Sequence, residues 1–228
     1  MMPAGIYIHI PFCLRKCFYC DFYSEATNDE HVRKGYTRAL LKEIGFYGAK
    51  YGKTFIADTV FFGGGTPSLM EPELIEKILR MLKKNFFIAQ DSEITMECNP
   101  ATLTAEKLMK YRKLGVNRLS IGAQSFDDEI LRKLGRVHKA EDIAKTVELA
   151  RKAGFGNISL DLMFAVPGQT MDKWKDSMEK ALCLKPEHLS FYSLEISENT
   201  VFGRMFREGR LRETPVEEDR RMYHTALD

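Results

Sequence analysis

Short apolar runs alternate along the chain with longer segments in which apolar residues recur every three or four positions. The short runs are typical of strands, and the longer segments are typical of amphipathic helices. We predict strands at 5–10, 59–62, 93–97, 118–121, 158–164 and 188–194. Between them we predict helices at 29–51, 71–85, 104–114, 140–152 and 171–184. Thr104 is a typical residue for a helix start, and Gly115 and Gly154 are typical of helix ends.

This alternation of strands and helices favours a parallel sheet with helices packed outside it. No linker rich in proline, glycine or serine divides the chain. We therefore predict an α/β fold in which residues 1–197 form a partial (β/α)6 barrel of the TIM type, because six strand–helix units are too few for a closed barrel. Residues 198–228 are more polar and end in a helical pattern at 217–228. We expect this segment to be the start of a truncated C-terminal region.

Chemically distinctive residues follow the predicted strands at their carboxyl ends or close them. They are Cys13, Cys17, Cys20, Gly63, Gly64, Gly65, Thr66, Glu97, Gln124, Asp161 and Glu195. The carboxyl ends of the strands of a parallel barrel form one rim, and active sites lie at that rim. We therefore expect these residues to meet in a single site.

The overall composition excludes several classes of protein. The 228 residues are 44% hydrophobic and 29% charged, which is typical of a globular protein rather than a disordered one. With 34 basic and 32 acidic residues, the charge gives no reason to expect a nucleic acid, and it suits a partner held through cofactor chemistry rather than through a charged surface. No apolar run approaches the roughly 20 residues of a membrane span. The apolar stretch 5–12 is a poor signal peptide, because no basic region precedes it and it contains His9 and Pro11. We predict a cytoplasmic protein.

The spacing of the cysteines indicates which kind of site the protein contains. Three of the five follow the pattern Cys13-x-x-x-Cys17-x-x-Cys20, which indicates a metal or cluster site rather than disulfides. An iron–sulfur cluster with four irons usually has four cysteine ligands, so three would leave one iron for a non-protein ligand. A zinc site with His9 as fourth ligand is the alternative. Cys98 and Cys183 have apolar neighbours, and we expect both to be small buried side chains.

The glycine-rich turn after the second strand suits an anionic group. Gly63, Gly64 and Gly65 allow close approach of the backbone and present N–H groups beside the Thr66 hydroxyl. The turn lacks the lysine of a P-loop and the spacing of a dinucleotide fingerprint, which argues against nucleoside triphosphates and NAD.

Taken together, the cysteine motif with Tyr19 before its third cysteine, and the later Gly-Gly-Gly-Thr turn, resemble the radical S-adenosylmethionine (SAM) superfamily. Within it, segments 7–13, 63–68, 97–100, 122–126 and 161–168 are similar to the coproporphyrinogen oxidase-like subfamily. The resemblance runs from about Gly5 to the end of the chain.

The resemblance implies a set of cofactors and the residues that bind them. Cys13, Cys17 and Cys20 would hold a [4Fe–4S] cluster whose fourth iron binds the amino and carboxylate groups of SAM. An electron donor such as flavodoxin or ferredoxin would reduce this cluster. His9 would either face the cofactor or pack inside the barrel, and no catalytic residue is assigned. The SAM site would consist of Tyr7, Tyr19 through its backbone, Gly64, Gly65, Thr66, Glu97, Gln124, Arg136 and Asp161.

The subfamily includes two kinds of protein with different activities. One is the oxygen-independent coproporphyrinogen III oxidase, which converts coproporphyrinogen III to protoporphyrinogen IX by oxidative decarboxylation. The other is a haem chaperone, which binds haem and delivers it to target proteins. The chain has Phe22 where the oxidases carry a further cysteine, and only four residues precede its first strand. Both features favour the chaperone, with the oxidase and a cluster-free zinc barrel as alternatives. His224 does not match the chaperone's C-terminal haem motif.

Overall fold

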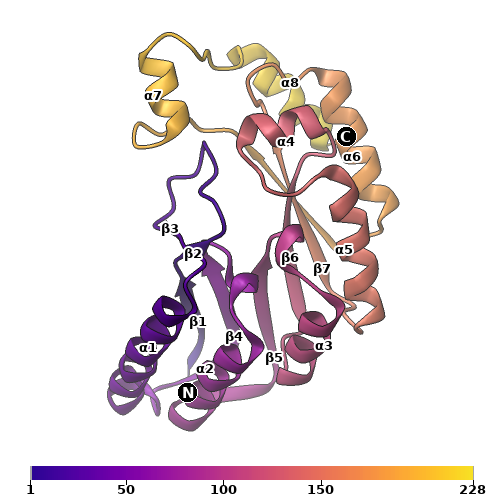
Figure 1. Ribbon diagram of the computed structural model, residues 1–228. Coiled ribbons are helices and arrows are strands. Elements are labelled where there is room, and N and C mark those ends of the chain that lie inside the picture. The colour runs from indigo at the N-terminus through magenta and orange to yellow at the C-terminus, as the bar shows by residue number, and fades with distance from the viewer. Residues whose placement is uncertain (1, 228) are drawn as a thin grey trace.

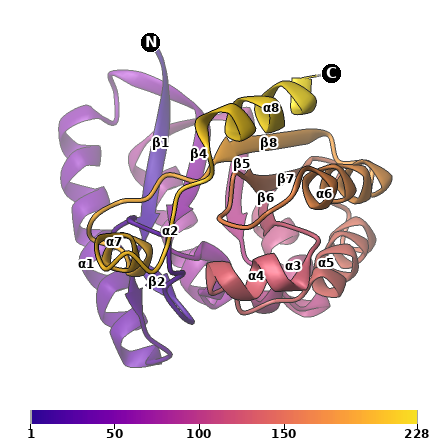
Figure 2. The ribbon, with the colours of Figure 1, turned by 90° about the horizontal axis from the view of Figure 1, so that it is seen from above.

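The computed structural model describes residues 2–227, and within this range six parallel strands form one curled sheet in the order β1-β4-β5-β6-β7-β8. The strands are β1 (Met2–Ile10), β4 (Phe55–Gly64), β5 (Phe87–Cys98), β6 (Arg118–Gln124), β7 (Ile158–Phe164) and β8 (His188–Ser193). The order runs from β1 at one edge to β8 at the other, so the sheet is an open, partial barrel (Figure 2). The predicted fold class is confirmed.

Helices cover the convex face of this sheet, as Figure 1 shows. They are α1 (Glu30–Tyr51), α2 (Pro72–Asn85), α3 (Ala105–Leu114), α5 (Ala140–Lys152) and α6 (Met171–Cys183). Three further helices lie near the carboxyl ends of the strands: α4 (Asp128–Leu134), α7 (Val201–Arg207) and α8 (Val216–Leu227). Short elements complete the fold: strands β2 (Phe12–Cys13) and β3 (Glu25–Ala26), and the 3-10 helices η1 (Pro67–Leu69) and η2 (Pro100–Thr102).

Local sequence signals explain where several helices begin and end. The Asp29 carboxylate accepts a hydrogen bond from the N–H of His31 at the start of α1, and the Thr104 hydroxyl accepts one from Lys107 at the start of α3. Helix α3 ends at Gly115, whose φ of 106° is left-handed and therefore suits glycine. The helix stop predicted at Gly154 comes one residue after the actual cap, Ala153.

Alternation along the strands separates the core from the concave face. In β1, Ile8 and Ile10 are buried in the hydrophobic core, while Tyr7 between Ile6 and Ile8 is 57% exposed. Hydrophobic core residues recur at every second position in β5 as well, at Ile94, Met96 and Cys98. Because successive side chains of a strand point to opposite faces, the residues between these core positions face the inside of the partial barrel. Polar side chains on the strands are therefore presented to the concave face.

Two cysteines outside the clustered motif behave differently. Cys98 is buried, as predicted. The prediction for Cys183 is wrong, because this residue is exposed. It is the last residue of α6, one position after Leu182, which is 59% exposed, so apolar neighbours in sequence do not bury it.

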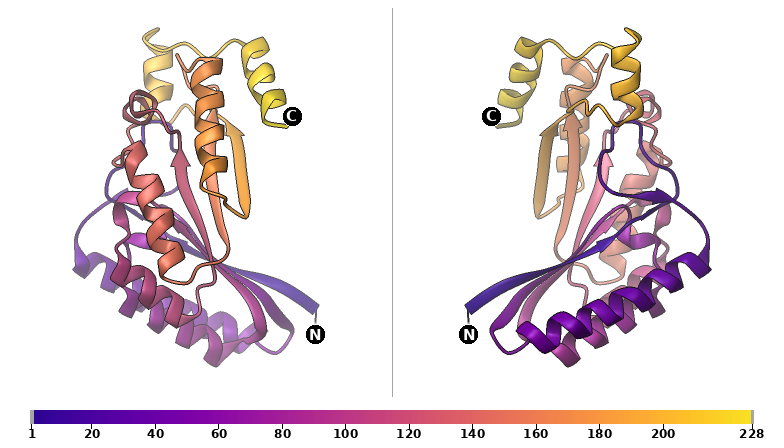
Figure 3. Two further views of the ribbon diagram at one scale, coloured as in Figure 1. Left: turned by 90° about the vertical axis from the view of Figure 1, so that its right-hand side faces the viewer. Right: turned by 90° about the vertical axis from the view of Figure 1, so that its left-hand side faces the viewer.

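The C-terminal helices lie at the end of the molecule where the strands have their carboxyl ends, and α8 packs beside α6 (Figure 3). Met222 of α8 is fully buried in the core shared with the sheet, and its carbonyl accepts a hydrogen bond of 2.9 Å from the Trp174 indole. The Ser193 hydroxyl donates to Asp219 at 2.7 Å. The domain boundary after residue 197 stays a prediction. In the part of the chain that the structure describes, no helix combines the length and apolarity needed to cross a membrane.

Candidate functional site

A cavity of about 870 Å³ opens at the carboxyl ends of the strands. Its wall consists of the cysteine loop between β1 and α1, the glycine turn after β4, and the ends of β5 to β8. The structure brings together in this wall all the predicted site residues except Tyr7 and Gly63. They are Cys13, Cys17, Tyr19, Cys20, Gly64, Gly65, Thr66, Glu97, Gln124, Arg136 and Asp161, and Glu195 joins them. The expectation of a single site at the rim matches this arrangement.

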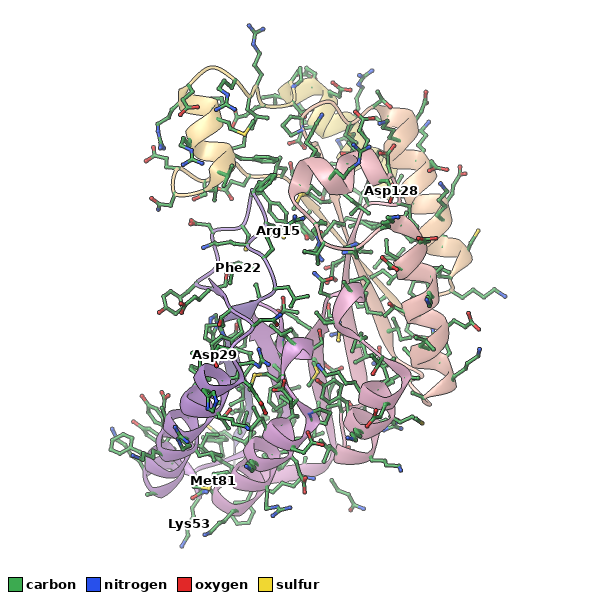
Figure 4. The ribbon with its side chains drawn as sticks, viewed as in Figure 1. Arg15, Phe22, Asp29, Lys53, Met81 and Asp128 are labelled. Atoms are coloured by element: carbon green, nitrogen blue, oxygen red, sulfur yellow. The ribbon has the colours of Figure 1, made fainter. Side chains whose placement is uncertain are left out.

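The cysteine loop is tethered to a helix that the sequence analysis did not predict. The N–H of Phe18 donates to the carbonyl of Leu134, the last residue of α4, at 3.0 Å. The guanidinium of Arg15 donates to the carbonyls of Gly135 and Arg136 at 2.7 and 2.6 Å. Figure 4 marks this loop with Arg15 and Phe22. These hydrogen bonds give the loop a defined position over the cavity.

Hydrogen-bond donors approach two of the three thiols. The Thr66 hydroxyl donates to Cys13 Sγ at 3.6 Å, and Arg136 Nη1 donates to Cys17 Sγ at 3.4 Å. Burial raises the pKa of the Cys20 thiol, and the neighbouring Cys17 and Cys13 raise it further. Three thiols are thus close enough to influence one another, and a bound cation would relieve the repulsion between their thiolates.

Gly65 makes room for the first thiol. A Cβ atom at this position would lie 2.8 Å from the Phe12 carbonyl oxygen and 3.0 Å from Cys13 Sγ. Its N–H donates to the Ile10 carbonyl at 2.8 Å, which fixes the turn against β1. Only glycine fits this close approach of two backbones beside a thiol.

This donor set fits an iron–sulfur cluster that leaves one iron open. Cys98 also borders the cavity, but its thiol lies 3.4 Å from the Met96 carbonyl, and burial raises its pKa. A buried thiol that stays protonated is a poor ligand. The cavity therefore provides three thiolate ligands for iron, all from the cysteine loop.

The zinc alternative depends on His9, which has other partners. Its Nε2–H donates to the Tyr23 carbonyl at 2.9 Å, and its Nδ1 is hydrogen-bonded to the Tyr7 hydroxyl at 3.1 Å. Within residues 2–227, no three His, Cys, Asp or Glu side chains are arranged to hold a single metal ion.

Two carboxylates face the cavity from neighbouring parts of the sheet. Glu97 accepts a hydrogen bond of 3.0 Å from the N–H of Gly64. Burial raises the pKa of Glu97 to about 7, with a smaller contribution from the charge of Asp161, while the Gly64 N–H opposes the shift. Burial also raises the pKa of Asp161, and the hydroxyls of Ser120 and Ser159 oppose that shift. Both groups would gain from a cationic or hydroxyl-bearing ligand.

Asp161 is held by hydroxyls from two strands. The Ser120 hydroxyl lies 2.8 and 3.1 Å from its two carboxylate oxygens, and the Ser159 hydroxyl lies 3.4 Å from one of them. The His188 Nδ1 is 2.8 Å from the Ser159 hydroxyl. These hydroxyls therefore orient the Asp161 carboxylate.

Backbone strain is present at the end of β6. Gln124 has a φ of 65°, a left-handed conformation that is uncommon for any residue except glycine. Its side-chain oxygen accepts a hydrogen bond from the Tyr192 hydroxyl. Nearby, Arg136 Nη2 donates to the Gly122 carbonyl at 2.7 Å, and its Nε is buried with no hydrogen-bond partner among residues 2–227. Strain and unpaired buried groups of this kind concentrate at functional sites.

Tyr7 lies beside the cavity rather than in its wall. Its ring stacks on Phe61 at a centroid distance of 6.1 Å. Phe61 does line the cavity, so Tyr7 borders the site through this contact. Its predicted contact with SAM stays a prediction.

One group of residues in the cavity wall was not predicted from the sequence. It consists of polar or charged residues on the concave face of β6, β7 and β8: Arg118, Ser120, Ser159, His188, Ser190 and Tyr192. The signal available in the sequence is their spacing of two residues along each strand, which places them on the same face as Asp161.

Comparison with known proteins identifies the family. The model of the Radical SAM superfamily matches residues 7–181. A Bacillus subtilis protein named heme chaperone HemW is 43% identical over 222 residues, which cover 97% of this chain and 58% of the relative. The oxygen-independent coproporphyrinogen III oxidase of Bradyrhizobium diazoefficiens is 32% identical over 223 residues, covering 96% of this chain and 50% of the relative.

The solved structure of HemN, the Escherichia coli coproporphyrinogen III oxidase described as a radical SAM enzyme, superimposes with a TM-score of 0.88 at 26% identity. The superposition covers 99% of this chain and 51% of that structure. An archaeal Elp3 structure from Methanocaldococcus infernus matches at a TM-score of 0.62 and 18% identity, which shows a shared fold. The chain spans about half the length of the relatives it matches.

Proposed function

Because the chain belongs to the radical SAM superfamily, we propose that it is a haem chaperone that binds haem and delivers it to target proteins. Membership of this superfamily implies a [4Fe–4S] cluster and SAM as cofactors. The observation that carries this proposal is the 43% identity to the Bacillus subtilis heme chaperone HemW over 97% of the chain. Phe22 supports it, since the oxidases of the subfamily carry a cysteine at that position.

Each side of the cavity has a role in this proposal. Cys13, Cys17 and Cys20 hold the cluster, which together with SAM supplies reductive one-electron chemistry when both are bound. The Thr66 hydroxyl and the Arg136 guanidinium donate to ligand sulfurs, and such hydrogen bonds tune an iron–sulfur cluster.

The remaining residues of the cavity bind SAM. Gly64, Gly65 and Thr66 line the part of the cavity that receives its amino acid end, where the absence of side chains at the two glycines allows close approach beside the open iron. Glu97 and Asp161 accept hydrogen bonds from its ammonium or ribose hydroxyl groups, and Gln124 can both donate and accept. Tyr7, the Tyr19 backbone and Arg136 complete this site.

The proposed function also implies binding partners and a cellular location. A one-electron donor reduces the cluster, haem is the cargo, and haem-accepting proteins are the clients. We place the protein in the cytoplasm, where thiolate ligands stay reduced. We also propose that the barrel domain ends at residue 197.

A second candidate function is oxygen-independent coproporphyrinogen III oxidation. The observations in its favour are the 32% identity to the Bradyrhizobium diazoefficiens oxidase and the fold shared with HemN. In that case the substrate would be coproporphyrinogen III, and the product protoporphyrinogen IX.

The test starts with the chain reconstituted anaerobically with iron and sulfide. We expect equal amounts of iron and sulfide, in the ratio of one [4Fe–4S] cluster per chain. Zinc without sulfide would contradict the proposal and support the zinc barrel. The reduced protein is then incubated with SAM and either coproporphyrinogen III or haem. Haem binding followed by transfer to an apo-cytochrome is expected. Formation of protoporphyrinogen IX with stoichiometric 5′-deoxyadenosine would instead establish the oxidase.

A further inference from the structure

The turn that ends β6 places the Gln124 side chain at the cavity through an unusual backbone conformation. Its φ of 65° is one that glycine adopts without strain and glutamine does not. The residue is nevertheless a glutamine, which is only 5% exposed and borders the cavity. Strain of this kind persists only where the surrounding structure enforces it. A neighbouring group must therefore hold this turn.

The turn is held at the carbonyl of Ala123, the residue before Gln124. This carbonyl accepts a hydrogen bond of 2.8 Å from the N–H of Ser125, which closes the turn from within. It also accepts one of 3.1 Å from Nε2 of His138, 15 positions along the chain. His138 lies in the segment that joins α4 to α5, and Figure 1 shows this segment beside the end of β6. One backbone oxygen thus receives a local donor and a donor from a separate segment.

The His138 ring is suited to this role as a donor. It is 3% exposed, and because a carbonyl oxygen only accepts, its Nε2 carries the proton. Burial and the charge of Arg136 lower the pKa of His138 to about 4, so the ring is neutral and Nδ1 can only accept. That Nδ1 is buried with no hydrogen-bond partner within residues 2–227, which costs free energy. An apolar ring would avoid this cost, and the bond to Ala123 is what an apolar ring could not provide.

Groups inside the barrel confine the far end of the same side chain. The Tyr192 hydroxyl of β8 donates to the Gln124 amide oxygen. Gly122 leaves room for the amide, because a Cβ at this position would lie 2.9 Å from Gln124 Nε2. The amide is therefore confined between β6 and β8, and its location depends on the backbone conformation that the His138 bond supports.

We propose that His138 is a positioning residue of the ligand site, whose hydrogen bond to the Ala123 carbonyl holds the strained turn that directs Gln124 into the cavity. The inference rests on the proposed function, in which Gln124 contacts SAM. His138 is not part of the cavity wall, so it acts on the ligand only through the turn after β6.

The experiment measures the affinity of the reconstituted chain for SAM by calorimetric titration, with urea unfolding as the measure of stability. His138→Phe removes the donor and keeps an aromatic ring. His138→Gln keeps a side-chain N–H donor. His31→Phe, at an exposed position of α1, is the matched control. His138→Phe is also made in a Gln124→Gly background, where the turn is unstrained and no side chain remains to be directed.

We expect His138→Phe to weaken SAM binding roughly 3- to 10-fold, the contribution of one hydrogen bond between neutral groups. His138→Gln should retain most of the affinity, and His31→Phe should bind like the wild type. In the Gln124→Gly background, His138→Phe should cause no further loss, because the two residues act as one unit.

An equal loss in both backgrounds, or equal losses in His138→Phe and His138→Gln, overturns the proposal, because His138 would then act through general stability. A His138→Phe chain that does not fold assigns the residue to the fold and overturns the proposal as well. If the wild type binds SAM and His138→Phe binds equally well, the inference is wrong while the SAM site stands. If the reconstituted wild type does not bind SAM, the proposed SAM site itself is wrong, and the inference is wrong with it.

Discussion

The Glu97 carboxylate accepts a hydrogen bond of 3.0 Å from the backbone N–H of Gly64, although 33 positions separate the two residues. This bond joins the end of β5 to the glycine turn that follows β4. Burial nevertheless raises the pKa of Glu97 to about 7, so the single hydrogen bond does not compensate for lost contact with water. Burial therefore disfavours the ionised form of Glu97, and a cationic group bound beside it would offset this effect.

We predict that the ligand-free chain loses stability as the pH rises from about 4.5 to about 7. The folded-state pKa of Glu97 is raised from 4.5, so its contribution is fully present below 4.5 and is lost as the pH passes 7. The loss should be at most about 3 kcal/mol. Urea unfolding at pH 5 and pH 8 measures it. Glu97→Gln should flatten the difference, whereas Glu179→Gln, at an exposed position, should keep it. An unchanged pH dependence in Glu97→Gln would contradict the assignment.

Cys17→Ser should abolish the visible absorption of the reconstituted cluster while the fold remains. The residue lies on a loop outside the core, and its thiol is one of three that the cavity offers to iron. Iron content, the visible spectrum and far-UV circular dichroism separate the two effects. Cys183→Ser, at an exposed site, should keep the full spectrum. Retention of the chromophore by Cys17→Ser would count against the three-cysteine ligand set.

The sequence predicts the long elements of this fold well, because their patterns extend over enough residues. The strands and the five long helices follow from alternation, from helical periodicity and from caps such as Thr104. Helices α4 and α7 have seven residues each, and so short a segment has too few apolar positions to show a period. Both nevertheless hold the cysteine loop, since the Phe18 N–H donates to the Leu134 carbonyl of α4 and the Phe18 carbonyl accepts from the Phe202 N–H of α7.

The candidate site is predictable to the extent that it depends on motifs at strand ends. The cysteine pattern and the carboxylates could be found in this way, and the structure brings them together. Contacts between distant residues could not be predicted, such as the bond from Arg15 to the Gly135 carbonyl across 120 positions. Ser120 and Ser159 were missed because their only signal is a spacing of two residues along a strand, which does not by itself mark a site. Tyr7 was predicted in the site but lies beside the cavity wall, because sequence does not fix how near a side chain comes to a cavity.

Gly65→Ala should prevent normal cluster assembly. The added Cβ would meet the Phe12 carbonyl oxygen at 2.8 Å and Cys13 Sγ at 3.0 Å, and a backbone oxygen cannot move away cheaply. We expect a large loss of bound iron after reconstitution. Gly156→Ala is the matched control, because nothing lies within 4 Å of a Cβ at that position. Equal iron contents in the two variants would show that the close approach at Gly65 is unimportant.

Met222→Ala should destabilise the chain by about 2–5 kcal/mol, the usual cost of removing a fully buried methionine side chain. Met222 is 0% exposed in the same core as the sheet. Chemical denaturation monitored by the fluorescence of Trp174, which donates to the Met222 carbonyl, measures the effect. Tyr223→Ala, whose side chain is 49% exposed, is the neighbouring control. A change below about 1 kcal/mol for Met222→Ala would favour a domain boundary before α8.

Ser120→Ala should weaken SAM binding to the reconstituted chain, because it removes the hydroxyl that donates to Asp161 at 2.8 Å. A hydrogen bond to a charged group contributes about 1.5–3 kcal/mol, so a loss of roughly 10-fold or more in affinity is expected. Ser159→Ala should have a smaller effect, since its hydroxyl lies 3.4 Å from the carboxylate and also contacts His188. Calorimetric titration with SAM gives the ranking, with Asp161→Asn as the reference. If Ser120→Ala binds as tightly as the wild type while Asp161→Asn is weakened, the hydroxyl does not position Asp161.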